Sequence, residues 1–160
     1  MKRVAIFIGS ASDKDTMQPC SDVLGSLGID HLYTITSAHR TPERTAQLVA
    51  ELEEQGCDVF ICAAGMAAHL AGVVASKTIK PVIGVPLNAS PLQGMDALLA
   101  TLQMPPGFPV GTVALDKPGA KNAAYMAAQI LALHDAELAD KLKAVRQGFK
   151  DSVEKAAAEM

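Results

Sequence analysis

Short apolar segments alternate with longer amphipathic segments along most of this chain. Five of the apolar segments are rich in β-branched residues and have the length of strands, over residues 4–8, 32–36, 59–63, 81–85 and 110–115. Most are continuously apolar, which is typical of the strands of a parallel sheet that is covered on both faces. The pattern therefore predicts a buried parallel sheet of five strands.

The segments between these strands carry helix signals. The segment 13–27 opens with the acidic cap Asp13 and closes at Gly28, and such a pair marks the start and the end of a helix. Thr41 offers an N-cap hydroxyl and Pro42 suits the first helical position, so a second helix is expected to run to about residue 55. Further helices are predicted over residues 67–77, 91–102 and 120–133.

Alternating strands and helices indicate the α/β class. We predict a three-layer αβα sandwich with a parallel, doubly wound, flavodoxin-like sheet and a C-terminal helical extension. A doubly wound sheet binds its ligands at the carboxyl ends of its strands. In the extension, apolar residues recur at steps of three and four among many charges, as Leu138, Leu142, Val145, Phe149 and Val153. The whole chain 1–160 is expected to be one domain, with a core of about 1–135 and an amphipathic helix of about 136–158.

Charged side chains are scarce in the middle of the chain. They make up 19% of the whole sequence, against roughly 25% in typical soluble domains. Between residues 59 and 115 the charged side chains are Lys77, Lys80 and Asp96 alone, and the segment 120–133 adds Lys121. Surface this poor in charge suggests burial against other subunits, so we expect a homo-oligomer. A fully buried sheet flanked by small-residue helices is the alternative, and the two are compatible.

Charge and segment lengths argue against several classes of partner and location. A formal net charge of −3 gives no electrostatic footprint for nucleic acid or an anionic membrane. The apolar run after Arg3 is too short for a signal peptide, and no run approaches the ~20 residues of a membrane span. The three cysteines show no metal-ligand spacing, and Cys62 lies in an apolar run typical of a core thiol. A cytoplasmic protein without a metal is expected.

The loop after the first strand is a candidate anion site. It contains Gly9, Ser10, Ser12 and Asp13 at the start of a helix, where backbone N–H groups and the helix dipole favour a negative charge. It is neither a P-loop nor a dinucleotide fingerprint, because the required lysine and later glycines are missing. Simple helix capping by Ser12 or Asp13 remains the alternative.

The loop after the second strand combines a titratable group with a phosphate-binding group. His39 titrates near neutrality, and the neighbouring Arg40 carries a planar guanidinium fork. Ser37 precedes them. An ordinary surface histidine is the alternative interpretation, but the position at the same sheet edge as the serine loop favours function.

The loop after the third strand is built of small residues that let a ligand approach the backbone. It includes Gly65, Ala68, His69 and Leu70, with His69 expected in the first turn of a helix. A packed loop whose histidine bonds a carbonyl is the alternative. Residues 88–90 add amide and hydroxyl groups after the fourth strand, and the proline-dense loop 103–109 is expected to wall a pocket. His31 and His134 are interpreted as structural.

These motifs together resemble the class I N5-carboxyaminoimidazole ribonucleotide mutases over nearly the whole chain. The resemblance is carried, in chain order, by Gly9-Ser10-x-Ser12-Asp13, Ser37-Ala-His-Arg-Thr-Pro42, Ala64-Gly-x-Ala-Ala-His-Leu70, Pro81-Val-Ile-Gly-Val-Pro86 and Gln103-Met-Pro-x-Gly107. Five ordered matches are far more specific than any single motif. The resemblance implies an enzyme of purine biosynthesis that moves a carboxylate from the exocyclic amine to the adjacent ring carbon of an aminoimidazole ribonucleotide. It implies no metal and no cofactor, and assembly as octamers.

The resemblance also implies roles for individual residues. It makes His39 the catalytic acid–base group and places the ribose phosphate portion of the substrate on Ser10, Asp13 and Arg40. The loop from Gly65 to Leu70 would enclose the imidazole. Substrate contacts are accordingly expected at Ser10, Ser12, Asp13, Ser37, Arg40, Gly65, Ala68, His69 and Leu70.

Three positions depart from the family pattern. Met66 stands where glycine is expected, Ala71 replaces a usual proline, and Ser90-Pro91 is unusual. The nearest rival is the aminoimidazole ribonucleotide carboxylase branch, which uses free carbon dioxide, but it typically has lysine at the position of Arg40 and lacks the Ala-His-Leu of the third loop. A non-enzymatic flavodoxin-like nucleotide-binding or receiver module is a rival of another class. A receiver needs an aspartate after its third strand, where this chain has Ala63-Ala64-Gly65.

Overall fold

A computed structural model describes residues 3–160, so Met1 and Lys2 of the amino-terminal segment lie outside the described residues. Five strands form one parallel sheet in the order β2-β1-β3-β4-β5. They span β1 Val4–Ile8, β2 His31–Ile35, β3 Val59–Gly65, β4 Val82–Leu87 and β5 Gly111–Thr112. In the central register, Val4 lies between His31 of β2 and Val59 of β3. The predicted flavodoxin-like sheet is confirmed.

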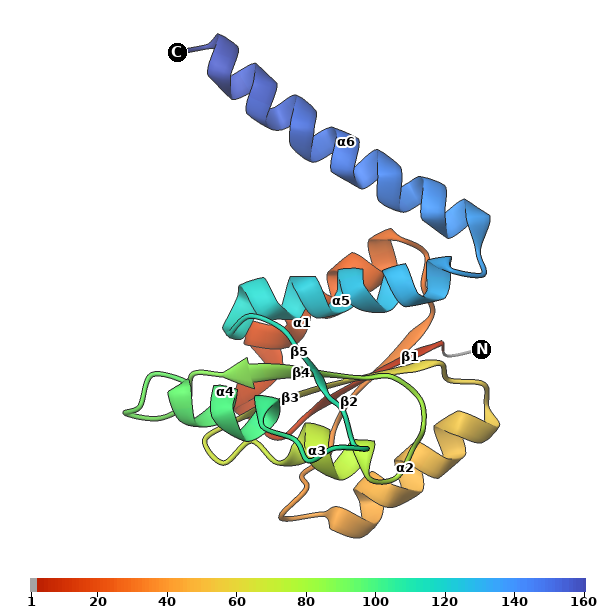
Figure 1. The fold of residues 1–160 in the computed structure, drawn as a ribbon, viewed down its shortest axis with the longest axis vertical. Helices are drawn as coiled ribbons and strands as arrows, with labels where there is room; N and C mark the ends of the chain where they lie inside the picture. The colour runs from red at the N-terminus through yellow and green to blue at the C-terminus, as the bar shows by residue number, and fades with distance from the viewer. Residues whose placement is uncertain (1–2) are drawn as a thin grey trace.

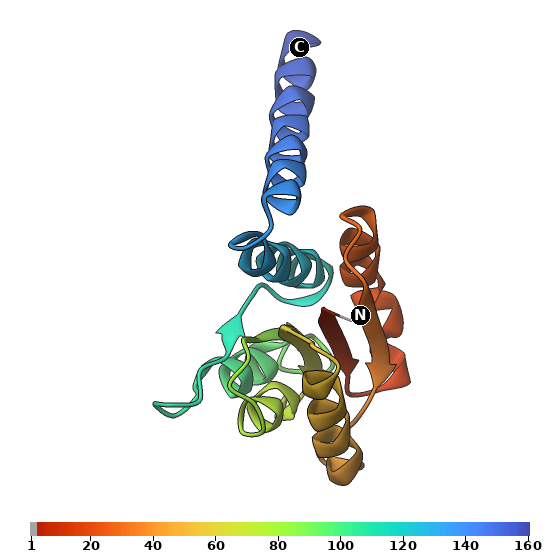
Figure 2. The same ribbon diagram turned by 90° about the vertical axis from the view of Figure 1, so that its right-hand side faces the viewer.

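Helices cover both faces of the sheet and complete the predicted three layers (Figure 1). The helices are α1 Lys14–Ser26, α2 Pro42–Glu54, α3 Leu70–Ala75, α4 Met95–Leu102, α5 Asp116–Ala132 and α6 Ala136–Ala158, with a 3₁₀ turn at Ala11–Asp13. Helices α1 and α5 pack together on one face, while α2, α3 and α4 lie on the other (Figures 1 and 2). Alternate side chains of β1 and β3 therefore fill two separate cores, since Ile6 and Ile61 belong to one and Phe7 and Phe60 to the other.

Some predicted boundaries were wrong, each for a local reason. Helix α3 begins at Leu70 rather than at 67, because Ala68 N–H and His69 N–H donate to the carbonyls two residues earlier and form tight turns. Helix α4 begins at Met95 rather than at 91, because Gln93 and Gly94 have positive φ angles. Strand β5 covers Gly111–Thr112 instead of 110–115.

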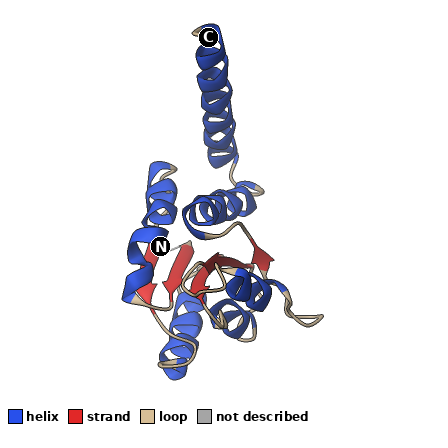
Figure 3. Ribbon diagram, turned by 90° about the vertical axis from the view of Figure 1, so that its left-hand side faces the viewer, coloured by secondary structure: helices blue, strands red, loops and turns tan. Residues whose placement is uncertain are grey.

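The C-terminal helix α6 has the predicted range and extends away from the sheet (Figures 1 and 3). The side chain of Asp135 caps it by accepting the N–H of Leu138 at 3.0 Å, and Arg3 forms an ion pair with Asp135 at 3.6 Å. Its apolar stripe packs on the core through Leu138, and the ring of Phe149 meets that of Tyr125 edge-on at 6.3 Å. Beyond this contact α6 is exposed.

The alanine-rich helix α5 corrects one expectation about surface. Its smooth, uncharged residues were expected to meet other subunits, yet Ala123, Ala124, Ala127 and Ala128 are completely buried inside this chain. Small side chains let α5 approach α1 and the sheet closely, which explains the lack of charge there. These four alanines are therefore not available as a contact surface for other subunits.

Candidate active site

Three loops meet at the point where the winding of the sheet reverses, between β1 and β3. Neighbouring strands there send their connections to opposite faces, which opens a crevice at their carboxyl ends. A cavity of about 630 Å³ occupies this place. Its lining comes from the loops after β1, β2 and β3 and from Ala89 after β4, and comprises Gly9, Ser10, Ser12, Asp13, Ser37, Ala38, His39, Arg40, Ala64, Gly65, Met66, Ala67, His69, Leu70 and Ala89.

The first loop is held by its own hydroxyl groups. Ser10 caps the 3₁₀ turn, because its Oγ accepts the N–H of Ser12 at 3.4 Å and the hydroxyl of Ser12 at 3.0 Å. Asp13 stands at the N-cap of α1, but its side chain makes no capping bond. Helix capping by Ser12 or Asp13 therefore does not account for this loop. The Asp13 carboxylate faces the cavity instead.

Asp13 has a perturbed pKa. Partial burial raises the pKa of its carboxyl group, while the Ser10 backbone, the Ser12 hydroxyl and the positive charge of Arg40 act in the opposite direction. Burial is the largest of these effects. The carboxyl group thus lies in a partly desolvated environment.

Thr41 fixes the second loop in an unexpected way. It occupies the N-cap of α2, but its hydroxyl does not cap the helix. Instead it accepts the N–H of Ser37 at 2.9 Å and donates to the carbonyl of Ser37 at 3.2 Å, which closes the loop on itself. The Ser37 hydroxyl then accepts the N–H of Arg40 at 3.1 Å. Ser37 therefore lines the cavity and also helps to hold the loop that carries His39 and Arg40.

Arg40 joins the second loop to the first. Its Nη2 donates to the carbonyl oxygen of Gly9 at 3.1 Å, and the side chain remains exposed. The other guanidinium N–H groups can still meet an anion beside the Ser10 loop. The geometry thus places a fixed positive charge beside the Ser10 loop, where it can attract an anion.

His39 and His69 form a pair across the cavity. Nε2 of His39 lies 2.7 Å from Nδ1 of His69, and the two rings meet edge-on with centroids 4.8 Å apart. A hydrogen bond between two imidazoles requires a donor on one ring and a lone pair on the other. The bonded pair therefore holds at most one positive charge. His69 bonds the other histidine through Nδ1, so the alternative of a simple carbonyl bond at that atom does not hold.

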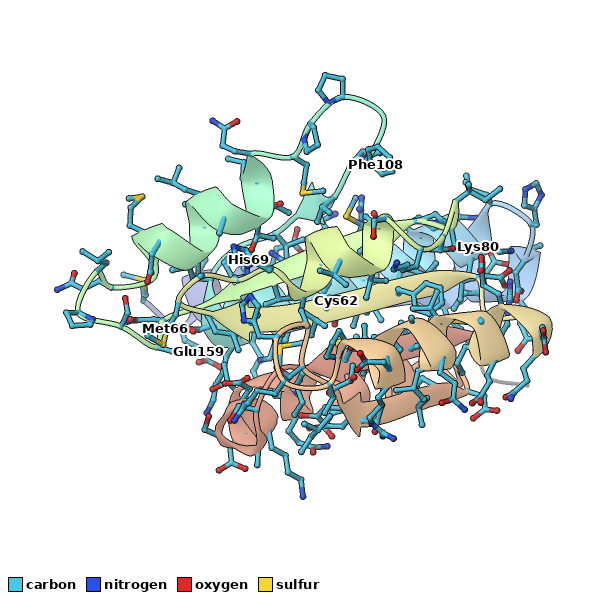
Figure 4. The ribbon with its side chains drawn as sticks, turned by 90° about the horizontal axis from the view of Figure 1, so that it is seen from below. Cys62, Met66, His69, Lys80, Phe108 and Glu159 are labelled. Carbon is cyan, nitrogen blue, oxygen red and sulfur yellow. The ribbon has the colours of Figure 1, made fainter. Side chains whose placement is uncertain are left out.

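The third loop brings the backbone close to its neighbours. A Cβ at Gly65 would stand 2.5 Å from Cβ of Ala89, so this position requires glycine. Leu70 lines the cavity from the start of α3, whereas Ala68 is 2% exposed and lies outside the lining. His69 is the N-cap of α3 rather than a residue of its first turn. Figure 4 shows Met66 and His69 at one end of the sheet, and Lys80 at the other.

Two later loops lie outside the His39 cavity. The proline-dense loop walls a pocket as predicted, but a different one: Gly107, Phe108 and Pro109 border a separate groove of about 860 Å³ with Lys80. After β4, Asn88 N–H donates to the Asp116 carboxylate and Ser90 accepts from Leu92. Neither Asn88 nor Ser90 lines the cavity.

The remaining histidines and the cysteines lie outside the site. His31 is structural as expected, since its ring contacts the Ser21 hydroxyl at 2.7 Å and the Ile29 carbonyl at 2.9 Å. Cys20, Cys57 and Cys62 are free and buried, and burial raises the pKa of the Cys62 thiol, which makes it inert. In residues 3–160 no group of histidine, cysteine and carboxylate side chains could hold a metal ion. None of the helices in that range combines the length and apolarity of a membrane span.

The fold and the cavity define a flavodoxin-like α/β protein whose site combines an imidazole pair with a serine-rich loop and an arginine. The chain belongs to the AIR carboxylase family, whose model matches residues 3–152. It is 48% identical over 151 residues to a protein of Escherichia coli K12 named N5-carboxyaminoimidazole ribonucleotide mutase, covering 94% of this chain and 89% of that one. A mutase of the same name from Thermotoga maritima is 48% identical over 153 residues, with 96% and 88% covered. The crystal structure of Treponema denticola PurE superposes with a TM-score of 0.89 at 28% identity and covers 98% of this chain and 97% of that one.

Proposed function

We propose that this chain is an N5-carboxyaminoimidazole ribonucleotide mutase of purine biosynthesis in which His39 is the proton carrier. The observation that carries the proposal is the meeting of His39, His69 and Arg40 with the serine-rich loop around one cavity. The names of its relatives supply the reaction, and the cavity supplies the groups which that reaction needs. The substrate is a small ribonucleotide, and the proposed reaction uses no cofactor.

The reaction requires one proton to be given and one to be taken. As the bond between the exocyclic nitrogen and the carboxylate carbon breaks, its electron pair stays on nitrogen, which takes a proton from the His39 imidazolium, and carbon dioxide is released. The adjacent ring carbon then attacks carbon dioxide, and a carbon–carbon bond forms. His39 removes the proton left on that ring carbon. Substrate and product are isomers, so no other reactant is consumed, and a single imidazole that can both give and take a proton suits both steps.

His69 supports both proton transfers in this proposal. Its Nδ1, 2.7 Å from Nε2 of His39, holds the His39 ring in one orientation. When Nε2 of His39 carries a proton, Nδ1 of His69 can accept it in a hydrogen bond. When Nε2 of His39 is unprotonated, Nδ1 of His69 can donate to it. His69 is thus a positioning residue as well as a substrate contact.

The remaining site residues bind the nucleotide. Arg40, with Ser10 and Ser12 beside it, binds the phosphate. Asp13 lines the same cavity, where its carboxylate can accept hydrogen bonds from ribose hydroxyls. Ser37, Gly65 and Leu70 border the imidazole end near the histidines. Ala68 can contribute only through its backbone or by packing, since its side chain is buried.

The carboxylase reaction is the second candidate, because the matching family model bears the description AIR carboxylase. Two features favour the mutase. The relatives from Escherichia coli and Thermotoga maritima are named as mutases. Arg40 and the Ala-His-Leu of the third loop are also the residues by which the sequence resembles the mutase branch. Supplying the carbamate nucleotide and following the ring carboxylate by ultraviolet absorbance tests the proposal.

We also propose that residues 1–160 act as one catalytic domain in the cytoplasm and assemble as an octamer, the size that the family resemblance implies. Support comes from an apolar stripe on α4 and the turn before it. Leu92, Met95, Leu99 and Leu102 are 64%, 56%, 48% and 50% exposed. The spacing of four and three residues places Met95, Leu99 and Leu102 on one face of α4, and Leu92 lies in the turn before the helix. A stripe of this kind is typical of a subunit contact.

Leu99→Arg is expected to dissociate the assembly, because an arginine in an apolar contact would be desolvated without a partner. Light scattering should give a mass near the 16.7 kDa of one chain. Gln47→Arg is the matched control, since Gln47 is exposed on α2 beside Glu51, and it should leave the mass of the assembly unchanged. A Leu99→Arg protein of undiminished size would show that this stripe is not a subunit contact.

A further inference from the structure

Met66 adopts a backbone conformation that is unfavourable for any residue with a Cβ atom. Its φ angle is 55°, in the left-handed region where a Cβ atom is strained and glycine is preferred. The loop holds it there, because the Met66 carbonyl accepts the N–H of Ala68 at 2.9 Å. The sequence pattern of the resembled family has glycine here. Strain that persists at a site is a reason to look for a role of the residue that bears it.

Neither a local hydrogen bond nor core packing accounts for the strain at Met66. Asp116 has the same φ of 55°, but its carboxylate accepts the N–H of Asn88, 28 positions away in the sequence, at 2.9 Å, and this bond offsets the strain. A thioether has no comparable hydrogen bond to make. The side chain of Met66 is also 59% exposed, so it does not serve the core. Stability alone would therefore favour glycine at this position.

The position of Met66 indicates what the side chain can do. The remaining apolar side chains that line the cavity are four alanines and the buried Leu70. Met66 is thus the one long, exposed apolar side chain in the lining. It carries no charge and no proton to exchange, and its three flexible torsions let it lie over a planar ring.

We propose that Met66 is an apolar cap that retains carbon dioxide over the His39–His69 pair during the reaction. This inference rests on the proposed mutase function, in which carbon dioxide exists briefly free of covalent bonds. A long, exposed apolar side chain in the lining can exclude water and slow the escape of a small apolar molecule. Met66 would then determine the fate of the released carbon dioxide, favouring its attack by the ring carbon over its escape to solvent. The backbone strain is the cost of placing the side chain there.

A labelling experiment with three variants tests this. Carbamate substrate with ¹³C in its carboxylate is converted in unlabelled bicarbonate with carbonic anhydrase present, and mass spectrometry measures the label in the product. Met66→Ala keeps the Cβ strain but lacks the cap, and we expect it to lose label several-fold more than the wild type. Met66→Leu keeps both the strain and the apolar bulk, so it should retain label as the wild type does. Met66→Gly should lose label like Met66→Ala and melt at a higher temperature than that variant.

Each result has a definite meaning. Equal retention of label by Met66→Ala and Met66→Leu would contradict the proposed role of Met66 as a cap. If Met66→Gly melts at or below the melting temperature of Met66→Ala, the backbone at this position is not strained, and the inference loses its premise. A wild-type protein that makes no product from the carbamate would instead refute the proposed function. Product from the wild type with unchanged label in all variants would refute the cap alone.

Discussion

Replacing His39 by asparagine is expected to abolish turnover while the fold and nucleotide binding stay intact. Asparagine keeps a polar side chain in the loop, but its amide does not reach as far as Nε2 of His39, which lies 2.7 Å from Nδ1 of His69, and it cannot carry a proton. Losing a positioned acid–base group costs roughly 10²–10⁴ in rate. The loss should be at the upper end, because the proposed reaction uses His39 twice. Steady-state kinetics for kcat and calorimetric titration for binding measure the two effects separately.

His134→Asn provides the matched control for that experiment. His134 is exposed at the end of α5 and does not line the cavity, so the same substitution there should leave kcat unchanged. If His39→Asn keeps a tenth of the wild-type kcat, His39 is not the proton carrier.

Gly119→Ala is expected to destabilise the protein strongly. Gly119 is buried in the first turn of α5, and an added Cβ would clash with the backbone carbonyl of Ala114 and stand 3.2 Å from Cγ1 of Val85. Backbone on one side and a core strand on the other leave no flexible atom to move aside. Overpacking of this kind costs about 3 kcal/mol, which corresponds to a fall in Tm of roughly 10 °C for a chain of this size.

Gly148→Ala is the control that tests whether the loss of stability comes from the position of Gly119 or from replacing any helical glycine by alanine. No atom lies within 4 Å of a Cβ built at Gly148 in α6. Alanine favours the interior of a helix by about 1 kcal/mol over glycine, so this variant should melt slightly above the wild type. If Gly119→Ala melts within a few degrees of wild type, the close approach of α5 to the Ala114 carbonyl is not a constraint on the fold.

The layout of strands and helices was predictable because its signals are local. Strand β1 and helix α6 have the predicted ranges, since β1 is uniformly apolar and α6 has a clear periodicity with the Asp135 cap at its start. The start of α3 was not predictable in the same way. It depends on tight turns around a residue with positive φ, Met66, which no helix signal marks. Strand β5 pairs through Gly111 and Thr112 alone, so the apolar residues beyond them made the predicted strand too long.

The site was predictable as a set of loops but not as a set of contacts. Strand order places the residues after β1, β2 and β3 at one edge, and so the residues of the first two loops could be named from the sequence. The hydrogen bond between His39 and His69 joins residues 30 positions apart, and only the packed structure can show it. The alanines of the lining, such as Ala38 and Ala89, carry no chemical signal of their own. The proline-dense loop borders a pocket as predicted, but the sequence could not say that this pocket is separate from the His39 cavity, because stiffness indicates a wall without locating it.

Direct transfer of the carboxylate is the central claim, and one measurement tests it most directly. The enzyme is given N5-carboxyaminoimidazole ribonucleotide together with a carbon-dioxide scavenger, and the ring carboxylate is followed by ultraviolet absorbance. A mutase keeps released carbon dioxide in its cavity, so we expect product to form at the same rate with and without the scavenger. Loss of product in the presence of the scavenger, with recovery only on adding bicarbonate and aminoimidazole ribonucleotide, would contradict direct transfer and identify a carboxylase.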